Sequence, residues 1–165
     1  MIGEKRSTGD MEGILLESAI VPFIEKNTLD TVLQSMIGTV ALPVSAYSAV
    51  KKNGMPFYIR ARRAEKTGEV ICDVPIRNME ITKAELVGYS CADGKCVLVV
   101  RFGVGSGTYI RSLAEEIGKR LGYPATLKEL RRTKIGDFCI ENARQLRNPP
   151  CASVRSILGE LDKNH

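Results

Sequence analysis

The chain has 165 residues, of which 44% are hydrophobic and 26% charged, a composition typical of one soluble globular domain. The net charge is +5, with residues 1–50 acidic and residues 51–165 basic, which favours a polyanionic partner, nucleic acid first. No stretch is apolar enough to span a membrane, and the polar N-terminus is unlike a secretory signal. We therefore expect a cytoplasmic protein with no membrane partner.

The first part of the chain predicts short strands and one amphipathic helix. An Asn-Gly pair supplies the positive φ angles of a tight hairpin turn, and a glycine after an apolar stripe predicts a helix stop. The expected elements are a strand within Ile14–Val21, a helix over Leu29–Ile37 capped by Thr28 and stopped by Gly38, an irregular stretch over Thr39–Ala46, a hairpin over Tyr47–Tyr58 with its turn at Lys52-Asn53-Gly54, and a short basic helix over Phe57–Lys66.

The second part predicts a long hairpin followed by the clearest helix. Alternating polar and apolar residues indicate strand, and the apolar positions after residue 108 fall on one narrow stripe of a helix. The expected elements are a strand within Val70–Ser90, a turn at Ala92-Asp93-Gly94, a strand over Cys96–Phe102, a loop over Gly103–Gly107, a helix over Thr108–Leu121 ended by Gly122, a strand near Leu127–Thr133, and a C-terminal helix near Val154–Leu161. The residues alone thus indicate one mixed α/β domain.

The cysteine and histidine content argues against a metal site or a disulfide framework. Five cysteines form no CxxC pair, and the single histidine, His165, is the last residue. We expect buried or incidental thiols, no bound metal and no histidine base. No nucleophile stands beside a base, so hydrolytic triads are excluded as well.

A glycine-rich loop at residues 103–107 precedes the clearest helix and invites comparison with phosphate-binding loops. The dinucleotide-binding pattern fails because Thr108 stands where its third glycine belongs, and no Gly-Lys-Ser/Thr follows. Arg111 lies in the first turn of that helix, where the helix dipole disfavours a cation. The residue indicates a bound carboxylate or phosphate, although a surface arginine with no role explains it as well.

A second set of residues combines aromatic rings with cations between positions 47 and 66, a mixture typical of RNA-binding surfaces. A solvated basic helix with tyrosines packed inward explains it equally well. The candidate RNA-contacting residues here are Tyr47, Lys51, Lys52, Tyr58, Arg60, Arg62 and Arg63. Arg131 and Arg132 form a second basic spot, uninformative alone.

Four segments, in order, resemble the motifs of the TruB family of tRNA pseudouridine synthases. The first segment contains Ile2-Gly3, Thr8, Asp10 and Gly13, and the second contains Tyr47-Ser-Ala-Val-Lys and Tyr58-Ile-Arg-Ala-Arg. The third is Gly107-Thr-Tyr-Ile-Arg-Ser-Leu, and the fourth is Leu130-Arg-Arg-Thr-Lys-Ile-Gly-Asp-Phe. Together they cover nearly all of residues 2–138. The resemblance implies an α+β fold with a mixed, largely antiparallel sheet and flanking helices, like the second half of the family's catalytic domain. It also implies residues 1–147 as a partial catalytic domain and 148–165 as a C-terminal extension with a short helix and no PUA domain.

The resemblance implies an isomerase that converts the T-loop uridine of tRNA, U55, to pseudouridine. The base is flipped out, its glycosidic bond breaks, the uracil turns and a C–C bond forms, without cofactor or metal. In this family Arg111 corresponds to the arginine that pairs with the catalytic aspartate, and Leu130 to a leucine of the active site. Asp10 corresponds to the aspartate that holds the flipped nucleotide. Thr108 and Tyr109, within the arginine motif, are expected to contact the T-loop or T-stem.

The chain departs from the family pattern at its beginning. The GxLDxxAxG motif, which holds the catalytic aspartate, and the K-x-Y motif have no counterpart here, and Arg6 and Ser7 replace a Thr-Asp pair. We therefore expect that the acidic partner of Arg111 lies outside residues 1–165, that the isolated chain is inactive, and that a complementing N-terminal fragment is a candidate partner. The alternative is a non-catalytic RNA-binding module derived from the same fold.

Overall fold

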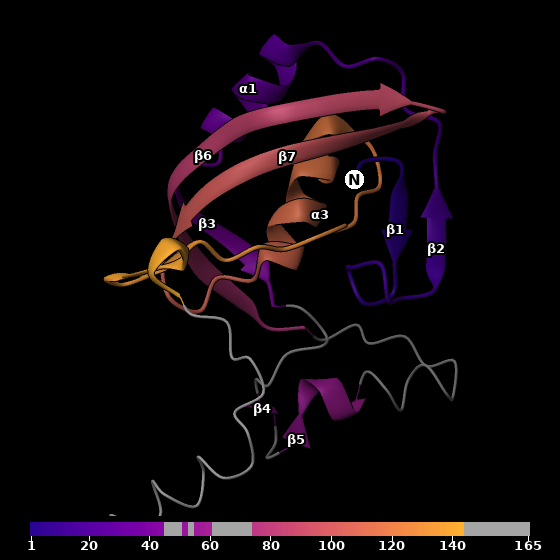
Figure 1. Cartoon of the computed structure of the whole chain (residues 1–165). Coiled ribbons are helices and arrows are strands. Elements are labelled where there is room, and N and C mark those ends of the chain that lie inside the picture. The colour runs from indigo at the N-terminus through magenta and orange to yellow at the C-terminus, as the bar shows by residue number, and fades with distance from the viewer. Residues whose placement is uncertain (45–50, 53–54, 61–73, 144–165) are drawn as a thin grey trace, which may run out of the picture. The chain divides into compact units, whose positions relative to one another are not determined.

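The structure, a computed structural model, describes residues 1–44, 51–52, 55–60 and 74–143 (Figure 1). Contacts divide the chain into two compact units, Met1–Leu130 and Arg131–His165. The fold is α+β, as the sequence predicts. The expected boundary at residues 147/148 and the helix near Val154–Leu161 lie outside the described residues.

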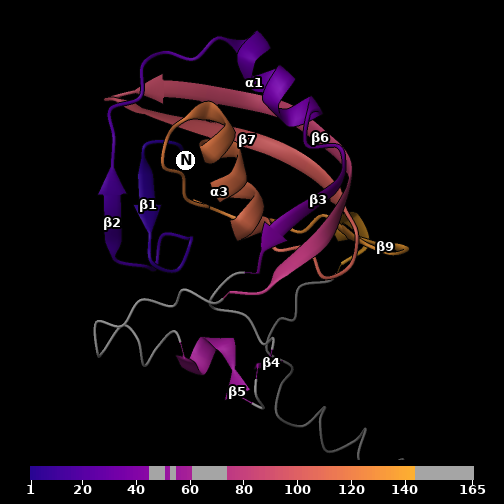
Figure 2. The same ribbon diagram turned by 180° about the vertical axis from the view of Figure 1, so that it is seen from behind.

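The centre of the first unit is an antiparallel sheet in the order β3-β6-β7, formed by β3 (Gly38–Pro43), β6 (Ile76–Ala92) and β7 (Lys95–Val104). Register shifts between Ile81 and Lys83 and between Leu86 and Gly88 interrupt the β6–β7 pairing. Such bulges bend a strand pair, and both strands curve over helix α3 (Ile110–Leu121) in Figures 1 and 2. Helix α1 (Lys26–Gln34) packs against β6 and α3.

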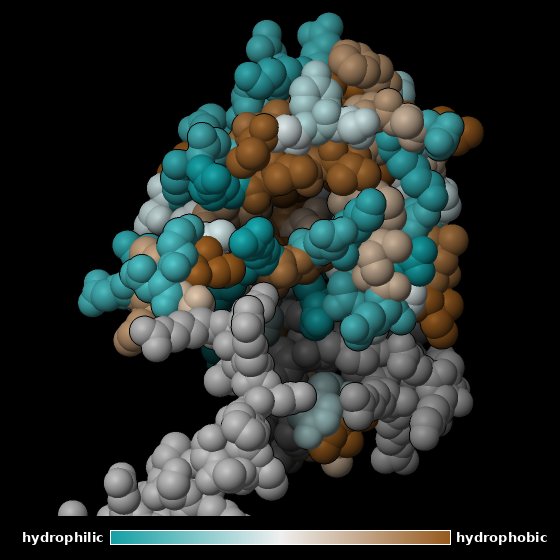
Figure 3. All heavy atoms as spheres, in the orientation of Figure 1, coloured by the Kyte–Doolittle hydropathy of each residue, from teal (hydrophilic) through white to brown (hydrophobic). Residues whose placement is uncertain are grey.

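A two-stranded ribbon carries the N-terminal motif. Strand β1 (Glu4–Arg6) pairs with β2 (Leu15–Ser18), and β2 leaves hydrophobic side chains exposed at the right-hand edge of Figure 3. Ile2 joins the ribbon to the sheet, because it forms antiparallel bridges with Cys96 on one side and Ala125 on the other. The loop between β1 and β2 is thereby held near the segment that follows α3.

The hydrophobic core lies between the sheet and the two helices. Its most deeply buried members come from α1 and the turn after it, and from β6, β7 and α3: Leu29, Leu33, Met36, Met79, Ile81, Cys96 and Leu113. The apolar stripe that predicts each helix therefore faces the sheet. Gly122 ends α3 in the left-handed conformation, at φ 81°, as the sequence predicts.

Local signals predict several further elements correctly. Positions 93 and 94 have φ angles of 52° and 70°, the pattern of the tight turn expected between β6 and β7. The predicted hairpin is confirmed where described: β4 (Lys51–Lys52) pairs with β5 (Met55–Pro56), with Lys52 opposite Met55. Residues 57–60 are helical, the first part of the expected basic helix.

Three expectations are wrong. Residues 38–43 form strand β3 rather than an irregular stretch, because pairing with β6 supplies hydrogen bonds that Pro43 interrupts only at the strand's end. Helix α1 begins at Lys26 and ends at Gln34, so Glu25, not Thr28, is its N-cap. The strand expected near Leu127–Thr133 is reduced to an isolated parallel bridge between Asp10 and Leu127.

The second unit is small where described. Strand β8 (Lys134–Ile135) pairs with β9 (Phe138–Cys139) across a turn in which Gly136 has φ 54°, and a 3-10 helix, η1 (Ile140–Asn142), follows. Arg131 and Arg132 belong to this unit and are exposed.

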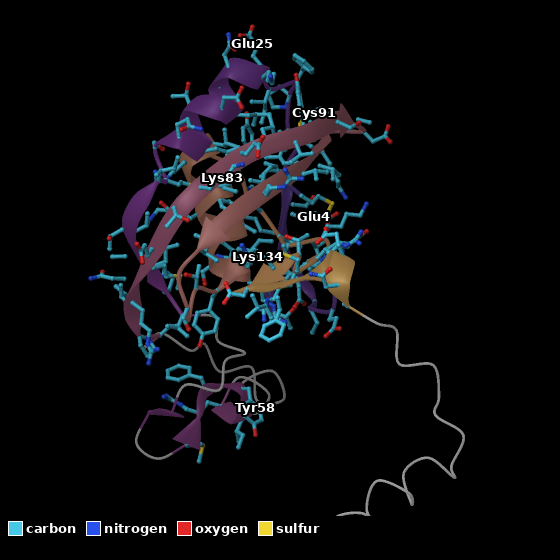
Figure 4. The ribbon with its side chains drawn as sticks, turned by 60° about the vertical axis from the view of Figure 1, so that its left-hand side comes forward. Glu4, Glu25, Tyr58, Lys83, Cys91 and Lys134 are labelled. Atoms are coloured by element: carbon cyan, nitrogen blue, oxygen red, sulfur yellow. A yellow bond between two sulfur atoms is a disulfide. The ribbon has the colours of Figure 1, made fainter. Side chains whose placement is uncertain are left out.

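Two cysteines contradict the expectation of unpaired thiols. Cys91 and Cys96 lie directly opposite each other at the turn end of the β6–β7 hairpin and form a disulfide; Figure 4 labels Cys91 near the end of β6. Cys139 is free, and the remaining two cysteines lie outside the described residues. None of the helices that the structure describes is long and apolar enough to cross a bilayer.

Glu4 is a buried carboxylate that ties the ribbon to the hairpin (Figure 4). One oxygen pairs with the Lys95 ammonium, and the other accepts hydrogen bonds from Arg6 Nε and Nη2 at 3.2 and 3.0 Å. The hydrogen bond from Lys95, and more weakly Arg6, hold the pKa of Glu4 below its ordinary value of 4.5 against the opposing effect of burial. Glu4 therefore stabilises the fold fully above pH ~4.5, and that contribution is lost as the pH falls through the folded-state pKa.

Replacing Glu4 with glutamine is expected to lower the free energy of unfolding by about 2 kcal/mol at pH 7, because two cations lose their carboxylate. Urea unfolding at pH 7 and pH 4 measures this, and the deficit should shrink at the lower pH. Glu17→Gln, an exposed carboxylate on β2, is the matched control and should behave as the wild type. An undiminished deficit at pH 4 would contradict the electrostatic origin.

Candidate RNA-binding and active site

The loop between β1 and β2 positions Asp10. Thr8 Oγ1 donates to Asp10 Oδ1 at 2.5 Å, and the backbone N–H of Glu12 donates to the same oxygen at 3.2 Å. Gly9 adopts φ 76°, and its carbonyl accepts a hydrogen bond of 3.0 Å from the backbone N–H of Leu127. These contacts fix one carboxylate oxygen within the loop and leave the other, Oδ2, for a second partner.

That second partner is Arg111. Its Nε lies 2.6 Å from Asp10 Oδ2, with the arginine side chain 37% exposed and the aspartate side chain 16% exposed. Arg111 therefore has an acidic partner within residues 1–165, whereas its pairing with the family's catalytic aspartate stays a prediction. The two terminal nitrogens, Nη1 and Nη2, make no hydrogen bond with any of the described residues. Because a guanidinium can bind two anions through different edges, Arg111 keeps the capacity for a further carboxylate or phosphate.

A cavity of about 200 Å³ lies beside this ion pair. Its walls come from the β1–β2 loop, the end of β3 and the first turns of α3, and its lining residues are Ser7, Thr8, Gly9, Pro43, Val44, Val74, Arg111, Ser112 and Glu115. Ser112 Oγ donates to the carbonyl of Pro43 at 2.7 Å, which holds the start of α3 against the end of β3. The lining therefore combines one cation, Arg111, one carboxyl group, Glu115, and several apolar side chains.

Glu115 lies on α3 one turn after Arg111 and lines the same cavity. Burial raises the pKa of its carboxyl above the ordinary value, and the positive charge of Lys5 opposes that effect. Glu115 is not among the site residues that the sequence predicts. An i, i+4 spacing from Arg111 on the predicted helix was the available signal.

None of the other predicted site residues that the structure describes lines this cavity. Thr108 and Tyr109 precede α3; Tyr109 is its N-cap, and Thr108 Oγ1 is buried without a hydrogen-bond partner among the described residues. Leu130, at the end of the first unit, is 58% exposed. Tyr58 is exposed, and the Arg60 guanidinium lies 5.1 Å from the centre of the Phe57 ring. Lys51 and Lys52 form β4, whereas Tyr47, Arg62 and Arg63 lie outside the described residues.

Among the described residues, no group of three or more His, Cys, Asp or Glu side chains is arranged to hold a metal ion. The chemistry that the cavity itself can offer is the binding of an anion by Arg111 and of a hydrogen-bonding group by Glu115.

Comparison with known proteins gives these residues a family context. The sequence model described as "TruB family pseudouridylate synthase (N terminal domain)" matches residues 1–110, which include Asp10. The chain belongs to the TruB family. A tRNA pseudouridine synthase B from Xanthomonas oryzae is 38% identical over 138 residues, which is 84% of this chain and 42% of the relative.

Two further relatives with the same name agree. The one from Francisella philomiragia is 38% identical over 161 residues, 97% of this chain and 50% of the relative. The one from Staphylococcus haemolyticus is 36% identical over 145 residues, 86% of this chain and 46% of the relative. The chain thus spans about half the length of the curated TruB relatives it matches.

Proposed function

We propose that this chain is the part of a tRNA pseudouridine synthase that binds the T-loop and T-stem and supports the catalytic carboxylate during conversion of U55 to pseudouridine. The observation that carries the proposal is the geometry of Arg111. Its Nε is occupied by Asp10, while its other two nitrogens form no hydrogen bond with the part of the chain that the structure describes and can take a second anion beside the cavity. In the family, the catalytic aspartate is the anion that pairs with this arginine.

The proposed roles follow from that pairing. A flipped uridine must be held while its glycosidic bond breaks and the uracil turns, which requires fixed contacts and a site shielded from water. Asp10 is held by the loop and by Arg111, so it is preorganised to contact the flipped nucleotide. Cations and rings at positions 47–63, and Arg131 and Arg132, are proposed to contact the RNA backbone and bases.

The edge of β7 supports the proposal of a complementing segment. β7 ends the three-stranded sheet, and among the described residues only Ile2 pairs with its outer edge, at Cys96. An antiparallel strand continued along this edge would lie opposite Leu98, Val100 and Phe102, all half-buried. An unpaired edge with apolar side chains favours the addition of a strand.

We expect residues 1–165 alone to bind tRNA and to release no tritium from tRNA labelled at uracil C5, because the segment that carries the catalytic aspartate in the family has no counterpart in this chain. Addition of the aspartate-bearing half of a TruB relative is expected to restore release. The matched control is the same half with that aspartate replaced by asparagine, which should bind and remain inactive.

Three outcomes discriminate the alternatives. Tritium release by residues 1–165 alone would contradict the proposal that another segment supplies the catalytic aspartate. Binding that weakens steeply with salt, without turnover under any complementation, would favour the non-catalytic RNA-binding module. Absence of tRNA binding would overturn both. With tRNA as substrate, a cytoplasmic location is part of the proposal.

A further inference from the structure

Glu115 lies in the wall of the cavity beside Arg111. It stands one turn along α3 from Arg111, and both side chains line the cavity beside the β1–β2 loop. A Cβ built on Gly9 would lie 3.3 Å from Glu115 Oε1, so the carboxyl packs directly against the backbone of that loop. The side chain therefore forms part of the cavity wall.

The carboxyl of Glu115 makes no hydrogen bond or ion pair with any residue that the structure describes. Of the other polar side chains near the cavity, Arg111 lines it and is paired with Asp10, and Ser112 donates to the carbonyl of Pro43. Lys5 on β1 is the cation that acts on Glu115, and it weakens the effect of burial without cancelling it. Glu115 is thus the one titratable side chain in the described cavity wall that is left without a partner of its own.

The charges around the cavity determine whether Glu115 is protonated or ionised when an anion binds beside it. Asp10 already neutralises part of the Arg111 charge, so an incoming anion joins one cation and one carboxylate. If Glu115 were ionised, it would place a second negative charge on the cavity wall beside the incoming anion, and like charges in one site favour protonation of one of them. A protonated carboxyl removes that repulsion and supplies a hydrogen-bond donor.

We propose that Glu115 is a further RNA-binding residue of this cavity, and that its protonated carboxyl donates a hydrogen bond to an oxygen of the RNA beside the ion pair of Arg111 and Asp10. This inference rests on the proposed function and adds to it a proton-dependent contact. The acceptor is a phosphate oxygen or a base carbonyl; both chemistries require the same donor.

The test is the affinity of residues 1–165 for a T-stem–loop RNA hairpin, measured by fluorescence anisotropy from pH 5 to pH 8 at constant ionic strength. Wild-type affinity is expected to fall about tenfold as the pH rises, because Glu115 ionises. Glu115→Gln keeps a donor and cannot ionise, so its affinity should remain at the wild-type acidic value throughout. Glu115→Ala lacks the donor and should bind weakly, with the same flat profile.

Two controls give the comparison its meaning. Glu17→Gln, on the exposed face of β2, should follow the wild-type profile. The Met1 ammonium, whose burial lowers its pKa to about 6, also titrates between pH 5 and pH 8 but is common to all variants. A hairpin that is abasic at the target uridine distinguishes the acceptors: the difference between wild type and Glu115→Gln persists for a phosphate and disappears for a base carbonyl.

The inference is overturned if Glu115→Gln retains the wild-type pH dependence while binding the RNA, an outcome that leaves the proposed function intact. It is overturned together with the proposed function if no variant binds the hairpin at any pH. Thermal unfolding of each variant establishes that a flat profile comes from a folded protein.

Discussion

Replacing Gly118 with alanine is expected to destabilise the first unit by about 3 kcal/mol or more, although the same substitution in an exposed helix would gain about 1 kcal/mol. Gly118 is a buried residue in the last turn of α3, and the chain turns back just after this helix. A Cβ at this position would overlap the Ala125 side chain and would lie 2.6 Å from the carbonyl oxygen of Tyr123. Neither neighbour can yield easily, since one is backbone and the other is core.

Gly118→Ala should also disturb the loop that carries Asp10. Ala125 forms a bridge with Ile2, and the backbone N–H of Leu127 donates to the carbonyl of Gly9 in that loop. A displaced 123–127 segment therefore moves the anchor of that loop. Urea unfolding and hairpin binding measure the two consequences. Gly88→Ala is the matched control, because a Cβ there meets open space; if Gly118→Ala unfolds at the same urea concentration as this control, the steric argument fails.

The sequence predicts best where the signal is local. The apolar stripe and the terminal glycine of α3, and the tight turn at Asp93-Gly94, each depend on a few neighbouring residues, and the structure confirms them. Strand β3 depends instead on a partner almost forty residues away, since Val40 pairs with Met79. Its own sequence, with Gly38 and Pro43 at the ends, carries too weak a strand signal to be recognised without β6.

Local sequence patterns also fail to predict the Cys91–Cys96 disulfide and the ion pair of Arg111 with Asp10. Whether Cys91 and Cys96 pair depends on the register of the hairpin, which places them opposite each other only when the turn has two residues. The helix dipole shows that Arg111 needs an anion, but it does not identify one. Asp10 is brought to it by bridges of Ile2 and Leu127 that no local pattern encodes. The resemblance supplied both residues and a role for each, yet not their contact.

Replacing Arg111 with lysine is expected to reduce turnover by the complemented enzyme about 100-fold or more, the scale of losing one preorganised charge contact in an active site. A guanidinium can hold Asp10 through Nε and a second carboxylate through Nη1 and Nη2, whereas an ammonium is a point charge that cannot present two planar edges. The loss should appear mainly in kcat, because the second carboxylate acts on the bound nucleotide. RNA affinity should change less, since one positive charge is retained.

Arg101→Lys is the matched control. Arg101 is an exposed residue of β7 whose Nη1 lies 3.8 Å from Glu85 Oε2, and it does not line the cavity. The turnover of Asp10→Asn should lie between those of Arg111→Lys and Arg101→Lys, because the uncharged asparagine side chain can still accept a hydrogen bond from Arg111. Tritium release at saturating tRNA gives kcat for each variant. If Arg111→Lys turns over as fast as Arg101→Lys, then one charge at this position suffices and the guanidinium does not bridge two carboxylates.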